Sequence, residues 1–145
     1  MEIRKAVIGD SGAVAELACR LWPCHTLAEM QPEMARIMEK SDAAFFLALS
    51  DRVPVGFAQC QLRYDYVEGT ESSPVGYLEG IYVAEGYRQQ GIARELLRAC
   101  EGWAKSLGCT EFASDCELTN GESLKFHLNV GFGEANRIIC FTKKI

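Results

Sequence analysis

YLEGIYVAEGYRQQGIARELLRACEGWAKSL, from Tyr77 to Leu107, is the stretch that decides the fold. It opens with a short apolar and aromatic run, Tyr77 to Val83, which favours a strand over a helix. From Ile92 onward, apolar residues recur at intervals of three and four, which predicts an amphipathic helix with one buried face. Gly108 follows at the usual position of a C-terminal glycine cap. The stretch therefore predicts a buried strand, a glycine-bearing turn and a helix.

The turn between this strand and helix has features of a phosphate-binding site. The first N–H groups of a helix lack partners within it, and the helix dipole makes this end positive. Gly91 allows close approach of the backbone to a ligand, and Arg88 adds a positive charge. The patterns of a P-loop and of a dinucleotide-binding fingerprint are both absent. These residues fit a pyrophosphate site, but equally an ordinary strand-turn-helix with a solvated arginine.

Length and composition indicate an ordinary globular protein. The 145 residues suit one domain with its own core, so we predict a single domain over 1–145. No apolar window is long enough to span a membrane, and the N-terminus lacks the apolar centre of a signal peptide. The seven cysteines are scattered without a Cys-x-x-Cys pair, which argues against a zinc site or a disulfide framework. We therefore expect a cytoplasmic protein with no metal and no membrane contact.

Acidic residues are concentrated in two parts of the chain. From Tyr64 to Tyr87 there are five acidic residues and no Lys or Arg, and from Ser106 to Leu124 there are four more, again without a base. No basic stripe is present, so nucleic-acid binding is disfavoured. Acidic stretches beside a binding site would attract a cationic substrate, although solvated loops would give the same pattern.

The rest of the chain predicts a mixed sheet with helices on both faces. We expect strands at 2–8, 43–50, 55–63, 77–83, 111–114 and 137–143, and helices beginning near Ser11, Thr26, Ile92 and Asn120, the first of them capped by Asp10 or Ser11. The strand at 111–114 should run parallel to the strand at 77–83, because a helix crosses between them. Ligands bind beyond the carboxyl ends of such strands, which would bring Glu79 and Asp115 into one cleft with the turn.

The motif Arg88-Gln89-Gln90-Gly91-Ile92-Ala93 resembles the Arg/Gln-x-x-Gly-x-Gly/Ala signature of the Gcn5-related N-acetyltransferases. The order of elements resembles that α/β fold over essentially the whole chain, with a mostly antiparallel N-terminal half and parallel central strands flanked by helices. Asn120, Ser123 and Gly131-Phe132 resemble the second motif of the family. The resemblance implies acetyl-CoA as co-substrate, bound by Ile81, Tyr82, Val83, Arg88, Gln89, Gln90, Gly91, Ile92, Ala93, Arg94 and Asn120.

Five further segments resemble the bacterial aminoglycoside 6'-N-acetyltransferases, which acetylate the 6'-amine of antibiotics such as kanamycin and tobramycin. The segments are Trp22-Pro-x-His25, Asp65-Tyr66-Val67, Ser72-Ser73-Pro74-Val75, Leu78-Glu79-Gly80-Ile81 and Ala113-Ser114-Asp115. The resemblance implies an enzyme of antibiotic resistance, a homodimer, and an acceptor pocket lined by Trp22, His25, Tyr66, Glu79 and Asp115. Asn136 stands where related enzymes can have a substrate-contacting Glu. Aminoglycosides carry several ammonium groups, which agrees with the acidic stretches.

The expected chemistry is direct attack of the neutral 6'-amine on the thioester, with the Val83 N–H polarising its carbonyl. Glu79 and Asp115 are candidates to accept the proton of the amine, or they only bind its charge. His127 stands where the family often has a Tyr that protonates the leaving thiolate, but it also suits a packed helix residue. Two alternatives remain open: an acetyltransferase for a polyamine, peptide or protein amine, and a non-catalytic acetyl-CoA-binding module.

Overall fold

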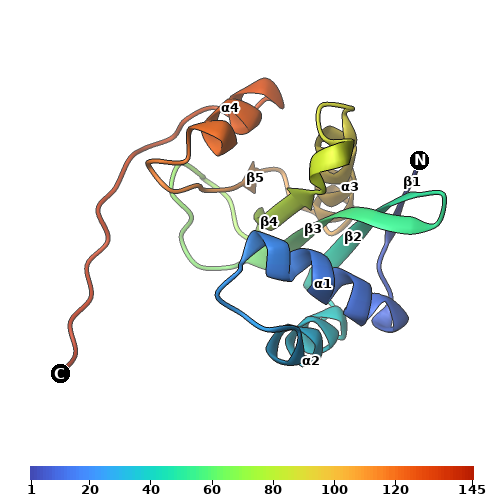
Figure 1. The fold of residues 1–145 in the computed structure, drawn as a ribbon. Coiled ribbons are helices and arrows are strands. Elements are labelled where there is room, and N and C mark those ends of the chain that lie inside the picture. The colour runs from blue at the N-terminus through green and yellow to red at the C-terminus, as the bar shows by residue number, and fades with distance from the viewer.

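A computed structural model describes all of residues 1–145 and contains a five-stranded sheet with helices on both faces (Figure 1). The strands are β1 (Glu2–Lys5), β2 (Ala43–Ser50), β3 (Val53–Arg63), β4 (Val75–Val83) and β5 (Phe112–Ala113); the helices are α1 (Ser11–Leu21), α2 (Leu27–Met38), α3 (Ile92–Ser106) and α4 (Gly121–Asn129), with short 3₁₀ turns η1 (Ile8–Asp10) and η2 (Glu85–Tyr87). The strand order is β1-β2-β3-β4-β5. The first four strands pair antiparallel and β5 pairs with β4 in parallel, which confirms the predicted mixed sheet.

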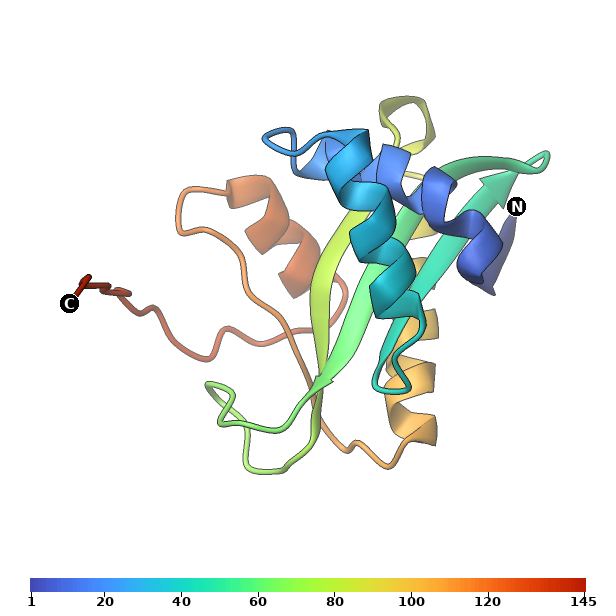
Figure 2. The same cartoon turned by 90° about the horizontal axis from the view of Figure 1, so that it is seen from below.

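The two faces of the sheet are packed by different helices. Phe45 and Leu47 of β2 are fully buried in a cluster with residues of α1 and α2. Their neighbours Ala44 and Phe46 point to the other face, into a cluster built around α3. Successive side chains of a strand alternate between faces, so a run of apolar residues serves both layers. Figure 1 shows α1 and α2 on one side of the sheet and α3 on the other, and Figure 2 looks onto the face of the sheet, with α1 and α2 in front of the strands and α3 behind them.

The N-terminal helices begin close to the predicted residues, but only one of the two is capped as expected. Thr26 accepts a hydrogen bond from the Glu29 N–H at 3.2 Å and caps α2. Asp10 makes no side-chain cap to α1, which corrects that prediction. Its carboxylate accepts two hydrogen bonds from Arg4, at 2.8 and 2.9 Å, and another from the Val7 N–H at 2.8 Å. A nearby guanidinium is a stronger partner for a carboxylate than a helix N–H group.

Strand β4 contains an irregularity at Glu79. Gln59 of β3 pairs with Gly80, whereas the next residue, Cys60, pairs with Leu78, so Glu79 has no partner in β3. One extra residue on one strand of an antiparallel pair is a β-bulge, which re-aims a side chain. On its other edge, β4 pairs with β5 only at Gly76 and Tyr77, which leaves the edge unpaired from Leu78 onward.

The prediction of a strand at 137–143 is wrong. Residues 133–145 have no regular secondary structure and run away from the sheet in both views (Figures 1 and 2). Their apolar side chains are exposed, to 65% for Ile138, 80% for Ile139 and 87% for Phe141. The segment has the composition of a strand, but a strand needs a neighbour for its backbone hydrogen bonds, and none lies beside it within this chain. None of the helices is both long enough and apolar enough to cross a membrane.

Candidate active site

Glu79 is held by an arginine from the neighbouring strand. Arg63, the last residue of β3, donates two hydrogen bonds to the carboxylate of Glu79, from Nε and Nη2, each at 2.9 Å. This is the two-pronged geometry that arginine and carboxylate groups favour. The Glu79 side chain is 19% exposed and that of Arg63 is 39% exposed, so the pair lies at the surface of the sheet rather than in its core.

Tyr77 connects this ion pair to Asp115. The guanidinium carbon of Arg63 lies 3.4 Å from the centre of the Tyr77 ring, a cation–π contact. The Tyr77 hydroxyl donates a hydrogen bond to the Asp115 carboxylate, just beyond β5. Burial, reinforced by this hydrogen bond, raises the pKa of Tyr77, so the phenol keeps its proton and acts as the donor. Arg63, Tyr77, Glu79 and Asp115 thus form one connected group, called here the Arg63 cluster.

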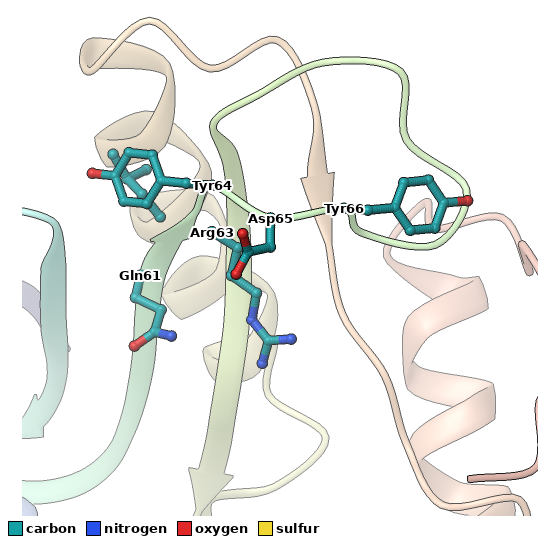
Figure 3. Close-up of a pocket in the computed structure, with 6 residues that line it drawn as sticks. Gln61, Arg63, Tyr64, Asp65 and Tyr66 are labelled. Atoms are coloured by element: carbon teal, nitrogen blue, oxygen red, sulfur yellow. The ribbon is translucent and has the colours of Figure 1, made fainter.

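A cavity of about 400 Å³ opens beside the Arg63 cluster, at the end of β3 (Figure 3). It is lined by Gln61, Leu62, Arg63, Tyr64, Asp65 and Tyr66. The rings of Tyr64 and Tyr66 project in opposite directions from this segment (Figure 3). Tyr66 is 78% exposed and makes no hydrogen bond or aromatic contact that fixes its ring, so the ring is available to a ligand.

Trp22 lies against the bulged part of β4. A side chain at Gly80 would place its Cβ 2.7 Å from the Trp22 ring, so the glycine makes room for the indole. The ring also packs edge-on against Phe57, with centroids 6.2 Å apart. The structure therefore brings Trp22 next to the residue that follows Glu79, as a wall of the predicted acceptor site.

His25 and Asn136 are engaged outside the Arg63 cluster. His25 is exposed, and its Nδ1 lies 3.6 Å from a carboxylate oxygen of Glu29, one turn along α2. Asn136, in the C-terminal segment, donates a hydrogen bond to Glu68 at 2.8 Å. Neither residue contacts Glu79 or Asp115 in this structure, so their predicted roles in substrate binding stay predictions.

The turn before α3 presents an open helix N-terminus. Gln89 and Gly91 have positive φ angles of 61° and 82°. No side chain caps α3, so no side-chain oxygen covers the N–H groups of its first turn. A Cβ at Gly91 would meet nothing within 4 Å, which shows that the space in front of the turn is open. These features fit the pyrophosphate of a coenzyme A molecule.

Arg88 supports this turn from within. Its Nε donates a hydrogen bond to the Val83 carbonyl at 2.8 Å, and its guanidinium lies 5.5 Å from the centre of the Tyr82 ring. The remaining N–H groups of the guanidinium stay available to a phosphate, since arginine carries five. Ile92 is buried under the turn and Arg94 donates to the Asn129 carbonyl at 3.1 Å, which ties α3 to α4. The predicted donor-side residues are thus assembled around one strand end and one helix start.

The sequence matches the model of one protein family over most of its length. Residues 13–132 match the acetyltransferase (GNAT) family. The chain belongs to this family. The match covers both acidic stretches, the turn and α4, and leaves only the two ends outside it.

Curated relatives of this acetyltransferase align over most or all of its length. The chain is 44% identical over 146 residues to the aminoglycoside N(6')-acetyltransferase type 1 of Acinetobacter genomosp. 13, covering 100% of this chain and 97% of the relative. It is 40% identical over 125 residues to the enzyme of the same name from Salmonella typhimurium, covering 86% of each chain.

Solved structures agree with the sequence relatives. One is AAC(6')-Iy in complex with the bisubstrate analogue CoA-S-monomethyl-acetylneamine, with a TM-score of 0.95 and 37% identity over 99% of this chain and 98% of the other. Another is the 6'-N-acetyltransferase AAC(6')-IG from Acinetobacter haemolyticus, with a TM-score of 0.94 and 40% identity over 100% of this chain and 99% of the other. The fold of this chain is therefore shared by a protein that was solved with an analogue joining coenzyme A to acetylneamine.

Asn120, which precedes α4, and His127, within it, both make hydrogen bonds inside the acetyltransferase. Asn120 caps α4, because its side-chain oxygen accepts a hydrogen bond from the Ser123 N–H at 3.1 Å; its amide N–H groups remain free for a ligand. His127 has both ring nitrogens engaged, Nδ1 with the Ser123 carbonyl at 2.6 Å and Nε2 with the Ser114 hydroxyl at 2.7 Å. A ring nitrogen facing a carbonyl must carry a proton, so neutral His127 accepts from Ser114 through Nε2.

Three residues of this acetyltransferase were not recognised as site residues from the sequence: Arg63, Tyr77 and Ser114. Arg63 directly precedes the first acidic stretch and is its nearest base in the sequence, a signal that was available. Tyr77 was read only as part of an apolar strand. Ser114 was noted beside Asp115, but its contact with His127 depends on how α4 packs. No group of three or more His, Cys, Asp or Glu side chains lies close enough to hold a metal ion.

Proposed function

We propose that this acetyltransferase transfers the acetyl group of acetyl-CoA to the 6'-amino group of aminoglycoside antibiotics and so confers resistance to them. The observation that carries the proposal is the Arg63 cluster, which sets two carboxylates and an aromatic ring next to the strand end that leads into the coenzyme turn. Identity of 44% over the whole chain to an enzyme named for this reaction supports it. A cationic aminosugar is a suitable ligand for carboxylates and aromatic walls.

On the donor side, the pyrophosphate of acetyl-CoA binds the N–H groups of Gln89 to Arg94, and the guanidinium of Arg88 assists. The pantetheine arm lies along the unpaired edge of β4 at Ile81 to Val83, where its amides hydrogen-bond as an added strand would. Asn120 contributes its free amide N–H groups from the other side. The open edge beyond Tyr77 and the open space in front of Gly91 support this placement.

On the acceptor side, Glu79 and Asp115 bind the ammonium groups of the aminoglycoside and Trp22 forms a wall. Tyr66 lines the cavity at the end of β3, and His25 and Asn136 complete the pocket. All three side chains are exposed, and His25 and Asn136 exchange their contacts with Glu29 and Glu68 for contacts with the ligand.

The reaction needs one proton removed from the amine and one supplied to the sulfur. The 6'-ammonium group first loses a proton to Asp115 or Glu79, directly or through water. The neutral amine then attacks the thioester carbon while the Val83 N–H stabilises the developing oxyanion, and the C–S bond breaks. For this step His127 first takes up a proton from solvent on Nε2, which then donates to the Ser114 oxygen. The Ser114 hydroxyl gives its own proton to the thiolate and takes the Nε2 proton across the 2.7 Å contact, which leaves His127 neutral.

We also propose that the enzyme is a cytoplasmic homodimer in which the segment 133–145 of each copy pairs with the partner. The exposed Ile139 and Phe141 need a surface to cover them, and β5, with only two residues, leaves an open sheet edge beside β4. All seven cysteines are free thiols, as expected in a reducing compartment.

Light scattering after size-exclusion chromatography tests the dimer. The full chain should elute at twice the mass of one chain, and Phe141→Asp combined with Ile139→Asp should shift it toward the monomer. Lys143→Asp, in the same segment but polar in both forms, is the control. A full chain with the mass of one copy contradicts the dimer.

Release of free thiol from acetyl-CoA tests the reaction, with kanamycin, spermidine and a basic peptide as acceptors. Release with kanamycin, and not with the other two, supports the proposal. Release only with spermidine or the peptide identifies the enzyme as a polyamine or peptide acetyltransferase. Coenzyme binding without release from any acceptor identifies a non-catalytic binding module. Mass and NMR analysis of the kanamycin product should place the new acetyl group on the 6' nitrogen.

A further inference from the structure

The acceptor carboxylate Glu79 already has a cation bound to it in this structure. The guanidinium of Arg63 donates two hydrogen bonds of 2.9 Å to the carboxylate and lies 3.4 Å from the centre of the Tyr77 ring. A carboxylate on one side and an aromatic face on the other are the contacts that an ammonium group of a substrate would seek. Arg63 therefore occupies a position built for a cation.

Arg63 is also joined to side chains from both acidic stretches, directly to Glu79 and through Tyr77 to Asp115. The stretches Tyr64 to Tyr87 and Ser106 to Leu124 contain no Lys or Arg, and they supply Tyr77, Glu79 and Asp115 to the Arg63 cluster. The hydrogen bonds that Arg63 donates to Glu79, and then the negative charges of Glu79 and Asp115, raise the pKa of Arg63 despite partial burial, so its charge is permanent.

The position of Arg63 allows it to leave. Its side chain is 39% exposed, it ends a strand, and it lines the cavity of about 400 Å³ at the start of the loop that follows. Figure 3 shows it projecting from the end of β3 within that lining. A partly exposed ion pair of this kind is weak, so a polycationic ligand can replace it.

We propose that Arg63 is an internal competitor of the substrate: in the free enzyme it holds the position on Glu79 and Tyr77 that an ammonium group of the acceptor takes in the complex. This inference rests on the proposed function. Arg63 then keeps the acidic site neutralised until a polycation displaces it. It determines specificity without touching the reacting atoms, and acceptors that cannot place an ammonium group on Glu79 do not displace it.

Arg63→Met, which keeps the length of the stem but removes the charge, tests the competition. The KM for kanamycin should fall about three- to fivefold, because the ligand no longer displaces a bound cation. The KM for acetyl-CoA should stay within about twofold of wild type, because the donor site lies beyond the bulge. The KM for kanamycin should also rise more steeply with NaCl in the variant, since one more carboxylate is free to attract it.

Arg98→Met is the matched control. Arg98 lies on α3 in an exposed ion pair with Glu95, with a 2.8 Å contact, so its removal changes the net charge by the same amount far from the acceptor carboxylates. Its KM for kanamycin should match wild type. A fall of similar size in both variants would mean that net charge alone attracts the substrate, and would overturn the proposal.

Arg63→Lys tests whether Arg63 competes with the substrate for Glu79 or positions Glu79 for the substrate. Lysine keeps the charge but cannot bind both carboxylate oxygens in the arginine geometry, so it competes less and the KM for kanamycin should lie between those of wild type and Arg63→Met. A KM at or above wild type in both variants would show that Arg63 shapes Glu79 for the substrate instead, and the proposal would be wrong. Failure of the proposed function is a different result, because wild type itself would then release no thiol with kanamycin.

Discussion

The proposed donor and acceptor sides of this enzyme are built from different parts of the polypeptide. The donor side is mostly backbone: the unpaired edge of β4, the positive φ angles of Gln89 and Gly91, and the uncapped start of α3. The acceptor side is almost entirely side chains, joined in the Arg63 cluster. A backbone site keeps its shape whatever the ligand, whereas a side-chain site can be emptied or refilled by single substitutions. The donor should therefore tolerate changes of side chain, and the acceptor should tolerate small changes of backbone.

Asp115→Asn should have the largest effect and fall on the acceptor only. We expect kcat/KM for kanamycin to drop about a hundredfold, because both a charge and a candidate proton acceptor are lost. The KM for acetyl-CoA should stay within about twofold. Steady-state kinetics with each substrate varied in turn measure both values, and equal losses for the two substrates would break the division between the sides.

Gly91→Val should have the next largest effect and fall on the donor. A β-branched residue at a φ of 82° is strained, and its side chain enters the space in front of the turn. Strain of about 1–2 kcal/mol predicts about a fivefold to thirtyfold rise in the KM for acetyl-CoA. Gly102→Val, in the middle of α3 with open space around it, controls for a general effect on the helix. A normal acetyl-CoA KM in Gly91→Val would contradict a backbone-built donor site.

His127→Ala and Ser114→Ala test whether these two residues supply a proton where the donor and acceptor sides meet. Each should lower kcat about tenfold if they deliver one proton in sequence, and the double variant should be no slower than either single one. His127→Asn tests packing, since it keeps a polar group in contact with Phe132 but cannot relay a proton. Turnover near wild type in His127→Ala would remove both residues from the mechanism.

Asp10→Asn should have the smallest effect on activity and serves as a structural carboxylate for comparison. Its hydrogen bonds from Arg4 hold the pKa of Asp10 below the ordinary value, so the carboxylate stabilises the fold above that value and the benefit disappears as the pH falls through the lowered pKa. At neutral pH the variant should melt a few degrees below wild type, and the difference should vanish in acid. Both KM values should be unchanged. A melting difference that persists in strong acid would assign the effect to something other than the charge.

The contrast between local backbone features and side-chain contacts also explains which parts of the fold and the site could be predicted from the sequence. The turn and α3 were predictable because their signals, glycine positions and apolar spacing, are local. Glu79 and Asp115 were predicted as site residues from charge and resemblance, but the ion pair of Arg63 with Glu79 was not predicted. That pair depends on the register of β3 and β4, including a bulge that no local pattern shows. Residues 137–143 were wrongly predicted as a strand for the same reason. Composition describes the tendency of a segment to be extended, but strand formation also needs a neighbouring strand, which local composition does not show.

The bulge at Glu79 has a consequence for how the site can change. Leu78 and Ile81 both pack toward α3 although an ordinary strand would place residues three apart on opposite faces, and Gly80 faces Trp22 on the other side. The extra residue absorbs this mismatch, so Glu79 is the one position of β4 between Leu78 and Val83 whose side chain belongs to neither packed layer. Substitutions there alter the charge offered to the acceptor without repacking the core. Acceptor preference and stability can therefore vary independently at this position.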